Sequence, residues 1–223
     1  MNTTKINLNI KTAILFGLML LLAQIVFSLV ILVPRYFLGY GITNKYLFQC
    51  AVFFVSFLAT VNIISSLKNI ELPYLLRFDK AKDIYFILAV SSAVALYFLE
   101  TRCIVPLVLY VAPRNNSLYW SFLTRGDNSY SYLLLAVIIA PFTEELFFRG
   151  IILRGMLANI KETKAIIISA VLFSIYHYNP YLFLPTFVIG LPLGYLYARS
   201  GSVVPCIVMH AVYNLFFRLE VYH

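Results

Sequence analysis

The feature that most limits how this chain can fold is a series of apolar runs, several of which reach about 18 to 20 residues. A helix of that length matches a hydrocarbon core about 30 Å thick. Hydrophobic residues make up 62% of the 223 residues and charged residues 12%. Soluble domains have roughly 45–50% apolar and about 25% charged residues. The sequence therefore predicts an all-α fold, a polytopic bundle of transmembrane helices.

The apolar runs predict seven spans, or eight if the third is divided. We expect them at Thr12–Val33, Tyr46–Leu67, Ile84–Val111, Tyr132–Leu153, Ala165–Tyr178, Leu182–Ala198 and Val203–Leu219. Glu100 and Arg102 interrupt the third run and Pro106 should kink it, so this run is either one long tilted helix or a helix and a short second piece. The first run is longer than the apolar part of a signal peptide and no small-residue cleavage pattern follows it. We interpret it as an anchor helix.

Lysine and arginine residues predict the orientation. With seven spans and the N-terminus inside, ten of these residues fall on the cytoplasmic side and five outside. The cytoplasmic ones are Lys5, Lys11, Lys68, Arg77, Lys80, Lys82, Arg154, Lys161, Lys164 and Arg199, and the outer ones are Arg35, Lys45, Arg114, Arg125 and Arg218. The net charge of +8 is thus mainly a topology signal. No basic run or motif indicates a nucleic-acid partner, and we expect the bilayer and a membrane-associated substrate as partners.

The chain reads as one integral membrane domain over residues 1–223. Residues 12–111 hold the N-terminal helices and residues 132–219 the helices with polar motifs. The longest polar connections, Lys68–Asp83 and Ala112–Ser131, are too short for a soluble domain. The three cysteines, Cys50, Cys103 and Cys206, are widely spaced in apolar runs, so we interpret them as small core residues. The short chain and the absence of a eukaryotic targeting signal favour a bacterial cytoplasmic membrane; the sequence predicts no oligomeric state.

Two glutamates and an arginine interrupt the fourth apolar run, at Glu144, Glu145 and Arg149. Each ionised group at membrane depth costs roughly 2.5–3.5 kcal/mol, so such groups are by default functional candidates. Glu145 and Arg149 are four residues apart and can pair on one helix face, whereas Glu144 is rotated by about 100°. A structural ion pair is the reading we favour for Glu145.

Polar residues also interrupt the fifth and seventh runs. Phe173 precedes His177 by four residues, and His210 precedes Asn214 by four. A single membrane histidine is more often a packing residue than a catalyst, and an isolated asparagine often joins helices. One ion pair, however, leaves Glu144, His177, His210 and Asn214 unexplained. Their conjunction favours a functional site if these helices are neighbours.

These motifs, Glu-Glu-x-x-x-Arg, Phe-x-x-x-His and His-x-x-x-Asn in this order, resemble those of the CPBP intramembrane proteases, named for CAAX proteases and bacteriocin-processing enzymes and also called the Abi family. The resemblance covers about Tyr132–Leu219. It implies a peptidase in which Glu144 is the general base, assisted by His177. It also implies that His210 and Asn214 form the oxyanion hole and that Arg149 orients the acidic pair of Glu144 and Glu145.

Metal dependence stays open at this stage. Glu144, His177 and His210 resemble a His₂Glu zinc shell, and family members are often described as metalloproteases. The sequence lacks His-Glu-x-x-His, and the family scheme works through glutamate-activated water. We therefore expect no obligatory metal, with zinc on these three residues as the alternative.

Two other functions remain as alternatives. The family resemblance allows a bacteriocin self-immunity or peptide-maturation protein, which could be the same protease seen in its biological role. A transporter could use the Glu, His and Arg cluster as an ion relay, but the chain lacks the internal repeat found in many transporters. Gly-x-Ser-x-Gly, P-loop and dinucleotide-binding patterns are also absent from the sequence.

Overall fold

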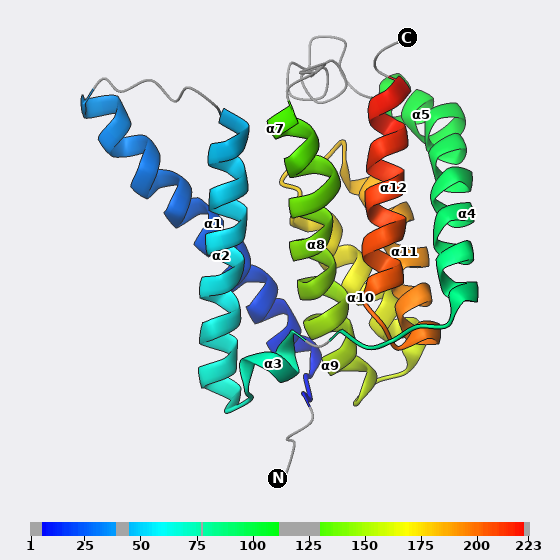
Figure 1. The fold of residues 1–223 in the computed structure, drawn as a ribbon, viewed down its shortest axis with the longest axis horizontal. Coiled ribbons are helices and arrows are strands. Elements are labelled where there is room, and N and C mark those ends of the chain that lie inside the picture. The colour runs from blue at the N-terminus through cyan, green and yellow to red at the C-terminus, as the bar shows by residue number, and fades with distance from the viewer. Residues whose placement is uncertain (1–5, 39–44, 77, 112–129, 221–223) are drawn as a thin grey trace. The chain divides into compact units, whose positions relative to one another are not determined.

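The structure is a computed structural model that describes residues 6–38, 45–76, 78–111 and 130–220. In these ranges every regular element is a helix (Figure 1). Four helices are long and apolar enough to cross a membrane, Ile10–Val30, Tyr46–Lys68, Asp83–Val108 and Tyr130–Leu157, and Val204–Phe217 is a shorter apolar helix. The predicted all-α membrane bundle is confirmed, and its count of seven or eight spans stays a prediction.

The helices form two compact units. The first holds α1 (Ile10–Leu38), α2 (Lys45–Lys68), α3 (Leu72–Leu75) and the helical stretch Tyr130–Leu157. The second holds α4 (Asp83–Leu99), η1 (Glu100–Ile104), α5 (Val105–Val111), α10 (Glu162–Ile175), α11 (Phe183–Ser200) and α12 (Val204–Glu220). The single membrane domain stays a prediction.

The stretch Tyr130–Leu157 alternates between α-helical and wider π-helical turns. It consists of α7 (Tyr130–Leu133), η2 (Leu134–Ile139), α8 (Ala140–Glu145), η3 (Leu146–Leu153) and α9 (Arg154–Leu157). All eight residues of η3 are buried. At the C-terminal end of the stretch, in α9, the carbonyl of Gly155 accepts a hydrogen bond of 2.9 Å from the N–H of Leu8. A Cβ on Gly155 would lie 2.4 Å from Cγ of Leu8, so only glycine permits this approach.

The third apolar run forms one continuous helix from Asp83 to Val111 and not two pieces. Its π-helical segment η1 ends two residues before Pro106, whose ring blocks the usual bond to the carbonyl four residues back. The two charges in η1 separate, because Glu100 is buried and Arg102 is exposed. Cys103 is exposed as well, so the interpretation of all three cysteines as core residues is wrong for this one.

Helices α10 and α11 pack closely in the second unit through two glycines. A Cβ on Gly190 would lie 3.0 Å from Cβ of Ala170, and one on Gly194 would lie 2.9 Å from Cγ2 of Ile166. Both pairs are spaced four residues apart on their helices, so the two helix faces meet along one turn. Small residues at this spacing let membrane helices approach without a side chain between them.

Polar segments that share a predicted membrane side meet within each unit. In the first, Arg154 Nη2 donates to the carbonyl of Tyr74 at 2.8 Å, at the same end as the contact of Leu8 with Gly155. In the second, Arg199 at the end of α11 pairs with Glu162 at the start of α10 at 2.9 Å. This agrees with the predicted grouping of segments; that this side is cytoplasmic stays a prediction.

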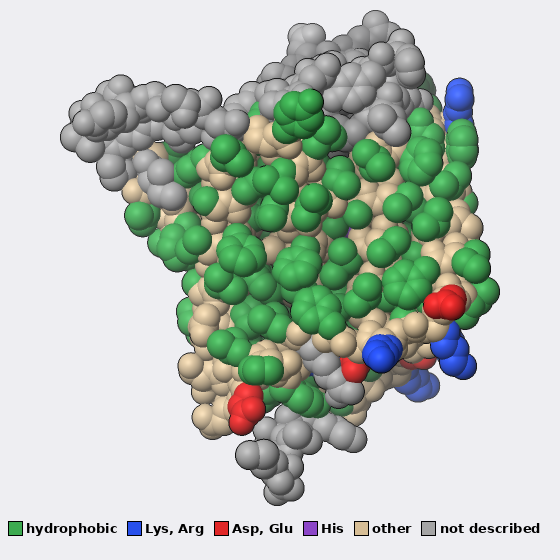
Figure 2. Space-filling view, in the orientation of Figure 1, with side chains coloured by type: hydrophobic (Ala, Val, Ile, Leu, Met, Phe, Trp, Pro, Cys, Tyr) green, Lys and Arg blue, Asp and Glu red, His purple; other side chains and the backbone are tan. Residues whose placement is uncertain are grey.

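Apolar side chains cover the outer faces of the helices. Leu22 on α1 is 59% exposed and Ile87 on α4 is 64% exposed. Figure 2 shows hydrophobic side chains along the visible flanks of the helices and most acidic and basic side chains near helix ends. Exposed apolar surface on this scale is typical of contact with lipid.

Candidate active site

The acidic pair lies where α8 passes into η3. Pro141 is the second residue of α8 and follows directly after the wider turns of η2, inside the continuous stretch Tyr130–Leu157. Thr143 Oγ1 donates back to the carbonyl of Ile139 at 2.8 Å. Glu144 is 5% exposed and Glu145 is fully buried. The local sequence thus places both carboxylates inside the protein, in the middle of a membrane-length helix.

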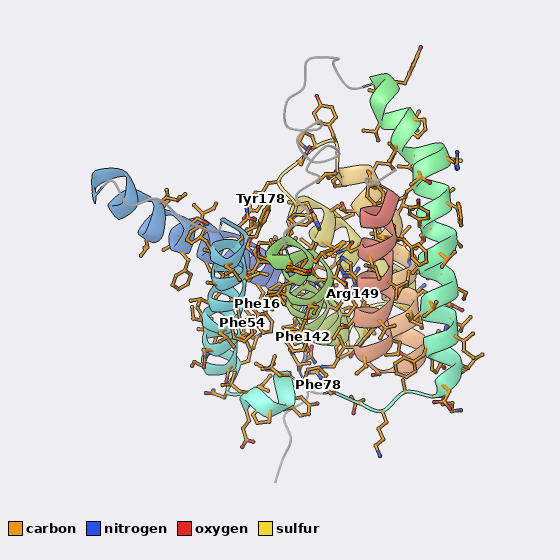
Figure 3. All side chains as sticks on the ribbon, turned by 45° about the horizontal axis from the view of Figure 1, so that its top comes forward. Phe16, Phe54, Phe78, Phe142, Arg149 and Tyr178 are labelled. Carbon is orange, nitrogen blue, oxygen red and sulfur yellow. The ribbon has the colours of Figure 1, made fainter. Side chains whose placement is uncertain are left out.

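Glu145 and Arg149 form the ion pair that their spacing predicts. Arg149 Nη1 lies 2.9 Å from Glu145 Oε1, and both side chains are fully buried. Figure 3 labels Arg149 and Phe142 on the helical stretch that carries the pair. Because each buried charge compensates the other, the pair fixes the turn that follows Glu144.

His177 lies just beyond α10, which ends at Ile175, so it belongs to a turn and not to the expected helix Ala165–Tyr178. Its Nδ1 lies 2.8 Å from the carbonyl oxygen of Phe173. A carbonyl can only accept, so Nδ1 carries the proton, and a neutral ring then presents the lone pair of Nε2. The next residue, Tyr178, has a positive φ of 54°, which turns the chain away after the histidine.

The ring of Phe173 packs against both His177 and His210. The ring of Phe173 is fully packed and meets both imidazoles edge to face, with centroid distances of 4.8 Å to His177 and 5.7 Å to His210. His210 is 5% exposed, and Asn214 follows it by one turn of α12. The second unit therefore gathers two histidines around one aromatic ring, with the asparagine on the same helix face as His210.

The six predicted residues thus form two sets of three, one in each unit. Glu144, Glu145 and Arg149 belong to the first unit. His177, His210 and Asn214 belong to the second. That both sets act at one site stays a prediction.

Whether Glu144, His177 and His210 hold zinc stays a prediction, because Glu144 belongs to one unit and the two histidines to the other. No cluster of three or more His, Cys, Asp or Glu side chains in the part of the chain that the structure describes could hold an ion. His177 and His210 share a neighbour in Phe173, but Glu144 belongs to the other unit.

A buried polar contact that the sequence did not predict lies one residue before Asn214. Tyr213 on α12 donates its hydroxyl to Oε2 of Glu100 on η1. Glu100 is 1% exposed and Tyr213 is 9% exposed. The sequence does mark Glu100 as a candidate, because it is a carboxyl group in an apolar run. It does not indicate the partner, which lies 113 residues away.

Comparison with known proteins identifies one family. Residues 126–216 match the family model described as type II CAAX prenyl endopeptidase Rce1-like. No curated protein and no solved structure matches the chain significantly. The matched segment contains all six predicted site residues, from Glu144 to Asn214.

Proposed function

Since residues 126–216 belong to the CAAX prenyl endopeptidase family of intramembrane proteases, we propose that this protein hydrolyses a peptide bond in a membrane-associated peptide or protein. The observation that carries the proposal is that this matched segment holds Glu144, His177, His210 and Asn214. These are groups that amide hydrolysis requires and that a purely structural membrane helix would avoid.

Glu144 is the proposed general base. Its neighbour Glu145 is engaged by Arg149 at 2.9 Å in a fully buried pair, which gives the two adjacent carboxylates different roles. The pair fixes the helix at the turn where Glu144 is attached. Glu144 can then take a proton from water during attack and return it to the leaving amine.

His177 is proposed to assist the base, because the bond from its Nδ1 to Phe173 leaves Nε2 as a proton acceptor. His210 and Asn214 are proposed to donate hydrogen bonds to the oxyanion. Such a donor is worth about 2.7–4 kcal/mol in a site without water. The proposal requires that the residues of both units act on one substrate.

We further propose that the protein is a multi-pass protein of the cell membrane, with its N-terminus in the cytoplasm. The support is the asymmetry of lysine and arginine residues together with the meeting of these segments at one end within each unit. The matched family description favours prenylated peptides as the substrate class to test first.

The test is peptide cleavage by the purified protein in detergent or lipid vesicles. A fluorogenic peptide with a prenylated C-terminal Cys-a-a-X sequence is compared with its unprenylated form. Wild-type protein should release the C-terminal tripeptide, and Glu144→Gln should not, because the amide keeps the shape but cannot accept the proton. Thr143→Val, which removes a hydroxyl on the same turn, serves as the matched control and should remain active.

Cleavage that persists in Glu144→Gln would contradict the assignment of the base. If neither peptide is cleaved, the same vesicles can be tested for proton or cation flux. Flux that depends on Glu144 would replace the peptidase with the ion-relay alternative.

A further inference from the structure

The contact between Glu100 and Tyr213 links the helix of Glu100 to the helix that carries His210 and Asn214. We propose that Glu100 is a positioning residue: through the hydroxyl of Tyr213 it sets the rotation of α12 and so the direction of His210 and Asn214. This inference rests on the proposed function for its catalytic consequence. Its structural part, the orientation of α12, is independent of that function.

The two residues form a bond inside the second unit. The hydroxyl of Tyr213 donates a hydrogen bond to Oε2 of Glu100, and both side chains are buried. The other carboxylate oxygen, Oε1, has no hydrogen-bond partner among the described residues. A buried carboxylate is costly unless its bonds are needed, so a residue kept here for packing alone would more readily be apolar.

Other contacts between α4 and α12 do not fix rotation as well. The ring of Tyr97 lies 5.7 Å from that of Phe216 and 6.4 Å from that of Phe217. Contacts between apolar rings tolerate sliding and turning, because burial has little directional preference. Ser202, just before α12, donates to the carbonyl of Asp79, which holds the opposite end of the helix. The bond to Glu100 is a directional contact of α12 that lies one residue from Asn214 and three residues from His210.

Helix geometry links this bond to His210 and Asn214. Successive residues of an α-helix are about 100° apart, which places Tyr213 about 60° from His210 on one side and Asn214 about 40° from it on the other. All three lie within little more than one turn. A rotation of α12 that separates Tyr213 from Glu100 must therefore also turn His210 and Asn214.

The functional test compares Glu100→Leu, Glu100→Gln and Tyr213→Phe in the peptidase assay. Glu100→Leu and Tyr213→Phe should each lower kcat on the order of 10-fold to 100-fold with little change in KM, as expected for misplaced catalytic groups. The double variant should be no worse than either single one, because both remove the same bond. Glu100→Gln should retain most activity, since its amide oxygen can still accept the hydrogen bond from the hydroxyl of Tyr213.

A matched control is Thr101→Val. Thr101 is the neighbour of Glu100 in η1, and its hydroxyl bonds only within its own helix, to the carbonyls of Tyr97 and Phe98. This variant should keep wild-type kcat. A Glu100→Gln variant as impaired as Glu100→Leu, or additive effects in the double variant, would overturn the proposal.

A second measurement does not need activity. In a Cys103→Ser background, the maleimide labelling rate of Asn214→Cys is divided by that of Leu215→Cys on the neighbouring face. Adding Glu100→Leu should change this ratio at least severalfold, and adding Thr101→Val should not. An unchanged ratio would overturn the positioning role even if the peptidase is active. A changed ratio in a protein that cleaves no peptide would support the orientation of α12 and reject the proposed function.

Discussion

At the scale of single residues, two buried carboxyl groups of this protein have partners of different kinds. Arg149 pairs with Glu145 from the next turn of the same helix. Glu100 instead accepts a hydrogen bond from the hydroxyl of Tyr213 on another helix. The first contact could be predicted from the sequence because a spacing of four residues fixes its geometry. The second could not, because no local pattern connects residues 100 and 213.

The first prediction concerns the roles of the two glutamates. Arg149→Ala should lower the free energy of unfolding by about 3–5 kcal/mol, because it leaves Glu145 buried without its cation. Glu144→Ala should abolish peptide cleavage but have a much smaller effect on stability. Thermal unfolding of both purified variants in the same detergent measures the difference.

A double variant controls for the loss of packing. Replacing both partners, in Glu145→Leu with Arg149→Met, removes the charges together and should recover much of the stability lost in Arg149→Ala. Equal unfolding temperatures for Arg149→Ala and Glu144→Ala would contradict this division of roles.

The second prediction addresses the donors of α12. Asn214→Ala should lower kcat by roughly 10²–10³ with little change in KM, because the oxyanion exists only along the reaction path. Activity and metal content are measured on one purified sample, before and after treatment with a chelator. Donors to an oxyanion predict activity that resists the chelator. Inactivation with loss of stoichiometric zinc, and its recovery on adding Zn²⁺, would instead assign His210 as a metal ligand.

At the scale of helices, the apolar runs predicted where the elements lie but not their internal geometry. The structure has a helix at each of the seven expected positions, with ends shifted by a few residues. The π-helical segments were not predicted, although η1 and η2 each end two residues before a proline, Pro106 and Pro141. Hydropathy reports apolar character averaged over many residues. It does not distinguish an α-helical turn from a wider π-helical turn.

The turn that holds His177 was also missed, for a related reason. The apolar run continues to Tyr178, but the helix ends at Ile175. The histidine itself bonds the carbonyl of Phe173 in the last turn of the helix. This ending depends on a side-chain bond that hydropathy does not register.

The third prediction concerns the close packing of α10 and α11. Gly190→Ala should lower stability by about 1–3 kcal/mol, since its Cβ would meet backbone Cα of Ala170 as well as its Cβ. Gly194→Ala should cost less, because the nearest atom belongs to the side chain of Ile166, which can move. Unfolding temperatures should follow this order.

Gly150→Ala is the matched control for these two variants. Its Cβ would have no atom nearer than 3.9 Å, and alanine favours a helix by about 1 kcal/mol relative to glycine. This variant should be as stable as wild type or more so. A Gly190→Ala variant with wild-type stability would contradict close packing at that position.

At the scale of the whole molecule, the positions of lysine and arginine determine which polar segments should share a membrane side. The structure agrees within each unit, where Arg154 contacts Tyr74 and Arg199 pairs with Glu162. Neither contact was predicted individually, because the positive-inside rule places segments on a side without naming partners. The contacts show which segments lie together, and only the positive-inside rule predicts that these segments face the cytoplasm.

The last prediction tests that assignment. A cysteine at Lys80, in the segment before α4, should resist a membrane-impermeant maleimide added to intact cells and should react once the membrane is permeabilised. Arg114→Cys, in a segment that the charge pattern places outside, should react in intact cells. Both are made in a Cys103→Ser background, because Cys103 is the exposed native cysteine of the described residues. Labelling at position 80 in intact cells, with position 114 protected, would reverse the topology. The residues that contact Arg154 and Arg199 would then face outward, against the preference of cationic side chains for the cytoplasmic side.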